Sequence, residues 1–113
     1  MNLTVNREAL LSACRLAARL LPERAVRPNE AYLLLRAADD VCELHAATGH
    51  DASLRLPLTA RVSAAGEALL AARDGLAVLR SSPAEEVAVE FSGDALVLRW
   101  PGARCRLESP PAA

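Results

Sequence analysis

Apolar and polar residues alternate over the first five positions, MNLTV, and then change to a helical period. The alternation predicts a short strand, and the period of 3.6 residues predicts a helix from about Arg7 to Leu21. Asn6 has an N-cap side chain, Glu8 suits the positive end of the helix dipole, and Pro22 cannot continue the helix. The helix should have an apolar face (Leu10, Ala13, Cys14, Ala17, Leu21) opposite a polar one (Glu8, Ser12, Arg15, Arg19).

Strand patterns return after PERAVRPNE, a segment without periodicity that predicts an exposed loop. AYLLLRAAD and VCELHAAT predict two strands joined by a tight turn at Asp39-Asp40. ASLRLPL and ARVSA predict two more, and Pro57 indicates that the first of them lies at an edge or stops there. A second helix is predicted from about Ala64 to Leu79 with Ser63 as its cap, although Asp74-Gly75 favours an early end.

The last third returns to strands. EEVAVEFSG, DALVLRW and ARCRLES predict a meander, with turns at Ser92-Gly93-Asp94 and Pro101-Gly102. The order of elements predicts an α+β fold made of a duplicated β-α-β-β-β unit, with both helices packed on the same side of one antiparallel sheet or a pair of sheets. We expect one domain over residues 1–109 and a flexible tail over 110–113.

All 13 basic residues are arginines, and their distribution is uneven. Residues 1–36 hold six Arg and three Glu, a net charge of +3, whereas the rest holds seven Arg and eleven acids, a net charge of −4. An anionic partner should therefore meet the N-terminal third. A GC-rich genome would equally produce a chain without lysine.

Other residues exclude several classes of function. Cys14, Cys42 and Cys105 are far apart with no C-x-x-C spacing, which favours reduced thiols in the cytoplasm. Arginines interrupt the apolar N-terminal segment, so it predicts neither a signal peptide nor a membrane span. His45 and His50 have no partner at a catalytic spacing, so we expect no enzyme, metal site, cofactor or small-molecule substrate.

Three segments, in order along the chain, resemble the N-terminal domain of the bacterial DNA polymerase III beta subunit, the sliding clamp. MNLTVNREALL is similar to the start of such clamps, AYLLLRAAD matches the family pattern N-L-L-L-x-x-A-D, and VAVEFSGDALVLRWPGARCRLES resembles the three-strand ending of the domain. Two features depart from the family. AATGHDASL lacks the Glu of the usual A-T-D-L-E, and Ala65 and Gly66 stand near the positions of a basic pair.

The resemblance implies a DNA-clamp fold and a non-catalytic processivity factor in DNA replication. Such a protein holds duplex DNA by weak, sequence-independent phosphate contacts. The implied DNA-binding residues are Arg24 and Arg27 on the loop and Arg15 and Arg19 on the polar helix face, with ordinary solvated charges as the alternative. The final strand would form the subunit interface through Arg104, Cys105 and Leu107, with Cys105 where the family often has Phe.

A second hypothesis remains open. The chain could be a stand-alone clamp-fold interaction module that binds a protein partner, either a replication factor or a clamp, rather than encircling DNA. The missing basic pair and the net charge of −1 favour the module, whereas the +3 N-terminal third favours DNA binding. A ring requires oligomers, whereas a module can be a monomer, so elution volume separates the two hypotheses. Self-association through the final strand is expected to be weak, and no membrane partner is expected.

Overall fold

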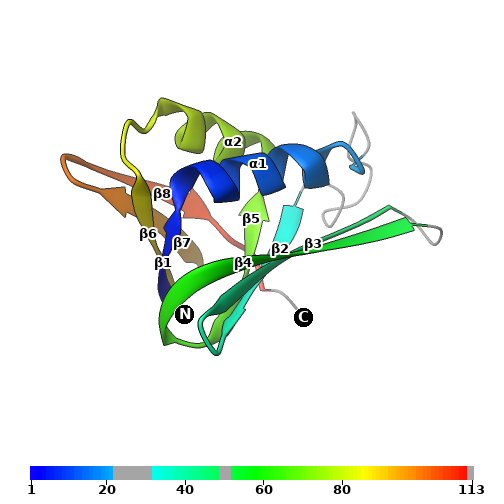
Figure 1. Cartoon of the computed structure of the whole chain (residues 1–113), viewed down its shortest axis with the longest axis horizontal. Coiled ribbons are helices and arrows are strands. Elements are labelled where there is room, and N and C mark those ends of the chain that lie inside the picture. The colour runs from blue at the N-terminus through cyan, green and yellow to red at the C-terminus, as the bar shows by residue number, and fades with distance from the viewer. Residues whose placement is uncertain (22–31, 49–51, 112–113) are drawn as a thin grey trace.

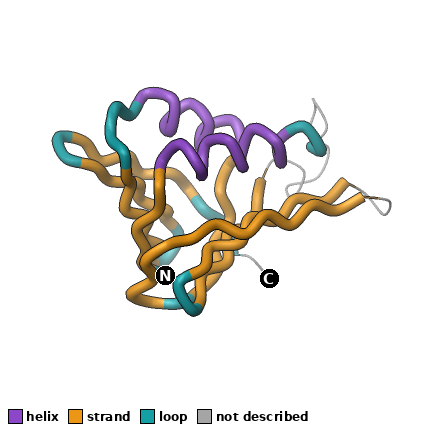
Figure 2. The backbone as a smooth tube through the Cα atoms, viewed as in Figure 1, coloured by secondary structure: helices purple, strands orange, loops and turns teal. Residues whose placement is uncertain are grey.

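The computed structural model describes residues 1–21, 32–48 and 52–111, whose strands form one antiparallel sheet beneath two helices (Figure 1). The eight strands are arranged in the order β5-β2-β3-β4-β1-β6-β7-β8. Both helices lie on the same side of this sheet, as Figure 2 shows, and they contact each other. The elements are β1 (Asn2–Asn6), α1 (Arg7–Ala18), β2 (Tyr32–Ala38), β3 (Val41–Thr48), β4 (Ala52–Ala64), β5 (Gly66–Ala71), α2 (Ala72–Ser81), β6 (Glu86–Ser92), β7 (Ala95–Trp100) and β8 (Ala103–Glu108).

Helix α1 confirms the prediction from periodicity, although it ends three residues earlier. The Asn6 side chain accepts a hydrogen bond from the Ala9 amide at 2.9 Å, which makes Asn6 the N-cap. The predicted apolar face is buried except for Leu21, which is half-buried, and the predicted polar face is exposed. Arg7 then anchors α1 to α2, because its Nε donates to the Ala84 carbonyl at 2.7 Å and its Nη1 to the Leu79 carbonyl at 3.1 Å.

The predicted tight turn between β2 and β3 is confirmed. Asp39 and Asp40 have φ values of 51° and 60°, the left-handed conformation that Asp tolerates better than most residues. The turn is also tied to β4. The Asp40 carbonyl accepts from the Ala60 amide, and its carboxylate accepts from the Val62 amide, both at 3.1 Å.

The two strands expected over residues 52–64 are a single strand, β4, and Pro57 does not interrupt it. Pro57 is opposite Glu43 of β3, whereas the pairing of β4 with β1 begins only at Ala60. Pro57 therefore lies where β4 has one neighbouring strand, so the missing amide hydrogen costs no ladder bond on the other side. The expectation of an edge is correct locally, and the expectation of a break is wrong.

The predicted second helix over 64–79 is wrong in its first half, where the chain forms β5. Ala68 and Leu70 are buried on one side of β5, and Leu70 pairs with Leu33 of β2. Tertiary pairing thus overrides the helix propensity of GEALLA. Ser63 is not a helix cap, because its hydroxyl donates to the Asn2 carbonyl at 3.1 Å.

Helix α2 begins only at Ala72 and continues through Gly75. An added Cβ at Gly75 would lie 2.9 Å from the Cγ and Cδ1 atoms of Leu70. Glycine therefore permits close packing of α2 on β5 rather than ending the helix. Neither helix described by the structure is long and apolar enough to cross a membrane.

The core lies between the sheet and the helices and consists almost entirely of Leu, Val and Ala side chains. One buried serine joins the two outermost strands of the sheet. Ser109, 1% exposed, follows β8, and its Oγ donates to the Leu69 carbonyl of β5 at 2.7 Å and accepts from the Leu69 amide at 3.1 Å. Its own amide donates to the Asp94 carbonyl at 2.8 Å. The ends of the sheet are thereby held together.

Candidate nucleic-acid interface

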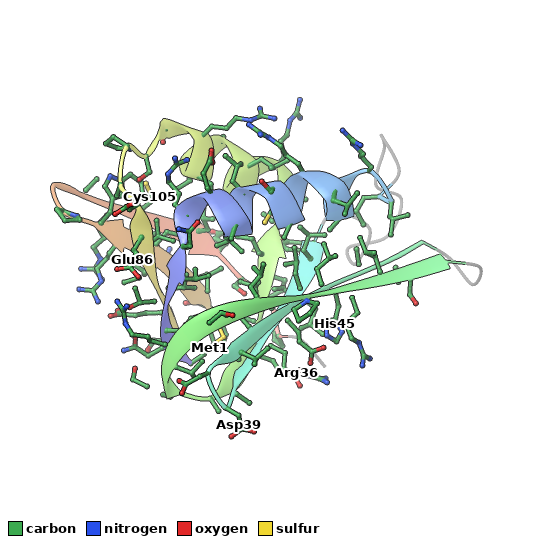
Figure 3. All side chains as sticks on the ribbon, in the orientation of Figure 1. Met1, Arg36, Asp39, His45, Glu86 and Cys105 are labelled. Carbon is green, nitrogen blue, oxygen red and sulfur yellow. The ribbon has the colours of Figure 1, made fainter. Side chains whose placement is uncertain are left out.

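The helix layer presents four exposed arginines. Arg15 and Arg19, predicted on the polar face of α1, are exposed there. Arg73 and Arg80 are exposed on α2, where their spacing of seven residues places them on one face, two turns apart. We call Arg15, Arg19, Arg73 and Arg80 the helix-layer arginines. Figure 3 shows nitrogen-tipped side chains that extend from the helix layer away from the sheet.

The sequence prediction did not include Arg73 and Arg80. It placed the helix from Ala64 to Leu79 and considered only its apolar residues and the absent basic pair. A helix that begins at Ala72 brings both arginines onto the surface of α2 next to α1. Their i, i+7 spacing within the sequence was the available signal.

The helix-layer arginines differ from most other arginines in their electrostatic partners. Within the described part of the chain, none of the four has a carboxylate within 4.0 Å. On the sheet, by contrast, Arg36 is 2.9 Å from Glu67, Arg61 is 3.1 Å from Glu86, and Arg99 pairs with Glu90. Uncompensated guanidinium groups make the helix layer a suitable surface for a polyanion.

Arg24 and Arg27, the loop residues expected to contact DNA, lie outside the described residues. His50 does so as well.

The predicted subunit interface lies on β8. This strand pairs with β7 and is the last strand at that end of the sheet. Arg104 is exposed, Cys105 is half-buried, and Leu107 is partly buried against the core. Arg106 Nη2 is 3.4 Å from Asp94 Oδ1, so Arg104 is the cation of this strand without an ion pair among the described residues. Charged side chains thus alternate with side chains that face the core.

A second unpaired edge was not predicted. Among the described strands, β4 pairs with β1 only from Ala60 onward, so residues 52–59 have β3 alone as a neighbour. We call this segment the β4 half-edge. Together with the outer edges of the terminal strands β5 and β8, the described part of the domain thus has three places where a further strand could extend the sheet.

The cysteines and His45 do not form a catalytic constellation. Burial raises the pKa of Cys14 to about 12 and that of Cys42 to about 11, so neither is a thiolate at neutral pH. Burial, assisted by the Arg55 charge, lowers the pKa of His45 and keeps it neutral. In residues 1–21, 32–48 and 52–111, no three His, Cys, Asp or Glu side chains gather in a metal-binding group.

Comparison with known proteins gives consistent matches. A family model described as the DNA polymerase III beta subunit, N-terminal domain, matches residues 1–109. The beta sliding clamp of Micrococcus luteus is 32% identical over 111 residues, which are 98% of this chain and 36% of that protein. The chain thus spans about a third of the length of the curated relative it matches.

Solved structures of beta clamps also match this chain closely in fold. The Caulobacter crescentus pol III beta structure is 26% identical, with a TM-score of 0.91 over 99% of this chain and 30% of its own. A Helicobacter pylori beta clamp bound to a DNA ligase peptide is 16% identical, with a TM-score of 0.91 over 99% of this chain and 31% of its own. At that identity the second likeness concerns the fold alone.

Proposed function

This chain belongs to the DNA polymerase III beta subunit family, whose N-terminal domain it matches over residues 1–109, and from that premise we propose that it is a DNA sliding-clamp domain. It acts as a non-catalytic processivity factor that holds duplex DNA during replication in the cytoplasm. The observation that carries the proposal is the set of four exposed helix-layer arginines, none of which has an ion pair with another residue that the structure describes.

The mechanism requires weak contacts to phosphate and no contacts to base edges. Exposed guanidinium groups on two adjacent helices donate hydrogen bonds to phosphate oxygens, which every sequence presents alike. Such contacts exchange readily with solvent ions, so the domain moves along the duplex while remaining attached. Four phosphate contacts predict a slope of about −3.6 for log K against log salt, or roughly a 150-fold loss of affinity from about 50 to 200 mM.

The test measures binding of fluorescent duplexes of several sequences by anisotropy over a salt series. Replacing two helix-layer arginines, Arg15→Ala with Arg73→Ala, should weaken binding equally for all duplexes and reduce the slope to about −1.8. The matched control is Arg61→Ala with Arg99→Ala, two ion-paired arginines on the sheet, which should leave the slope unchanged. Equal effects of the two double variants, or a preference for one sequence, would contradict the proposal.

We also propose that Arg24 and Arg27 contribute contacts, on the strength of the family resemblance. Each would add about 0.9 to the magnitude of the slope, so the chain would reach about −5.4 and the variant with Arg15→Ala and Arg73→Ala about −3.6. Arg24→Ala in the same assay should lower the slope by that amount, and an unchanged slope would remove Arg24 from the interface.

Two of the unpaired edges, β8 and the β4 half-edge, support a proposal about partners. We propose that Arg104, Cys105 and Leu107 on β8 form a junction with a strand of a neighbouring clamp domain, and that the β4 half-edge receives a strand in the same way. Because the two edges are different, the contact is head-to-tail rather than two-fold symmetric. The same edges favour the second candidate function, a clamp-fold module that binds a protein partner. That module would retain strand-mediated binding but show no salt-dependent affinity for DNA.

A further inference from the structure

A shallow pocket lies on the face of the sheet that points away from the helices. At its centre, four residues on four neighbouring strands lie side by side. Leu34 of β2 pairs with Leu69 of β5 and with His45 of β3, and His45 pairs with Arg55 of β4. Tyr32 and Leu54 also line the pocket, whose volume is about 260 Å³. Figure 3 shows His45 below the sheet, on the opposite side from the helices. We call this feature the outer-face pocket.

One polar atom of the outer-face pocket has no partner among the residues that the structure describes. That atom is His45 Nε2, which is buried and has no hydrogen-bond partner in residues 1–21, 32–48 and 52–111. The nearest carboxylate oxygen, Glu43 Oε2, is 3.8 Å away, which is too far for a hydrogen bond. A buried nitrogen without a partner is costly, so a ligand that pairs with Nε2 would gain the free energy that the unpaired atom costs.

Arg55 is the cation available at the rim. Its Nε is also 3.8 Å from Glu43 Oε2, and its side chain is 67% exposed. In the next row of the sheet, Arg36 and Glu67 pair closely at 2.9 Å and neutralise each other. Glu43 is therefore shared at long range by two groups that can donate hydrogen bonds, and a second carboxylate would serve both.

We propose that the outer-face pocket docks a short acidic segment of a partner protein. An aliphatic side chain of that segment fills the space between Leu34 and Leu69, and a neighbouring carboxylate accepts a hydrogen bond from Arg55. The His45 ring turns on binding, so that Nε2 reaches the pocket surface and donates to the same carboxylate. The pocket is smaller than the roughly 300 Å³ at which small-molecule sites begin, and it fits one or two aliphatic side chains. The site lies on the opposite face from the helix-layer arginines, so it stands or fails separately from DNA binding.

The experiment titrates the 15N-labelled chain with three capped peptides and follows its amide resonances. The probe is Gly-Asp-Leu-Val-Asp-Gly. One control has Lys in place of both Asp residues, and the other has Ser in place of Leu and Val. The probe should bind at least tenfold more tightly than either control, with the largest shifts in β2, β3 and β4. The peptide carboxylate should also raise the pKa of His45. Without peptide, burial lowers this pKa, as do the charges of Arg55 and Arg36, while Glu43 and Glu67 act in the opposite direction.

Variants separate the pocket from general surface charge. Arg55→Gln and Ala47→Glu, both at exposed rim positions, should each weaken binding of the probe about tenfold without loss of fold. Arg61→Gln, on the same strand but outside the pocket, and Arg15→Ala on α1 should have no effect. Equal binding of the three peptides, equal effects of Arg55→Gln and Arg61→Gln, or an unmoved His45 titration would overturn the proposal. So would concentration-dependent pocket shifts without peptide, because a second copy would then be the occupant.

Discussion

Ser109→Ala tests whether one hydroxyl group holds the two ends of the sheet together. The substitution removes both hydrogen bonds between Oγ and the backbone of Leu69, at 2.7 and 3.1 Å, and leaves an amide and a carbonyl of β5 without these partners. Each net hydrogen bond contributes about 0.5–1.5 kcal/mol, so the free energy of unfolding should fall by about 2 kcal/mol. At this chain length each kcal/mol corresponds to roughly 4 °C, which predicts a drop in Tm of about 8 °C.

The assay is thermal unfolding followed by circular dichroism, together with hydrogen exchange of the Leu69 amide. Ser63→Ala is the matched control, because the exposed Ser63 hydroxyl makes a single bond, to the Asn2 carbonyl, and its loss should cost less than about 1 kcal/mol. In Ser109→Ala, hydrogen exchange of the Leu69 amide should also become faster than in the unchanged chain, and by more than that of its neighbours in β5. Equal changes in Tm for the two variants, or unchanged exchange at Leu69, would show that Ser109 does not join the edges.

Two further predictions concern packing and assembly. Gly75→Ala should lower the free energy of unfolding by about 1 kcal/mol, because the clash with Leu70 outweighs the gain of about 1 kcal/mol in helix propensity. Urea titration measures this free energy, and a stabilised variant would disprove the close contact. Arg104→Glu should abolish weak head-to-tail dimers in sedimentation at high concentration without changing Tm, whereas Leu107→Asp should also reduce Tm because Leu107 packs against the core. Dimers that survive Arg104→Glu would place the junction elsewhere.

The sequence was sufficient where one local signal agreed with tertiary packing. The Asn6 cap and the apolar face of α1 have a helical period, and the Asp39-Asp40 turn has residues that tolerate left-handed backbone. It was insufficient for β5, because Glu, Ala and Leu are good helix formers and only the pairing with β2 makes them a strand.

The arginines of the candidate site were predictable only where the bounds of their helix were predicted correctly. Arg15 and Arg19 followed from the face of a correctly predicted helix, whereas Arg73 and Arg80 required the true start of α2. The outer-face pocket could not be found from sequence. It depends on the register that aligns Leu69, Leu34, His45 and Arg55, which are far apart along the chain.

The helix layer carries its positive charge on guanidinium groups alone, in a chain that has no lysine. Lysine acetylation, a common means by which cells remove positive charge, therefore has no target on this surface. Arginine methylation would preserve the charge and change only its hydrogen bonding. The guanidinium charge of the helix layer is thus fixed when the chain is synthesised, and ionic strength or a competing anion screens it from outside.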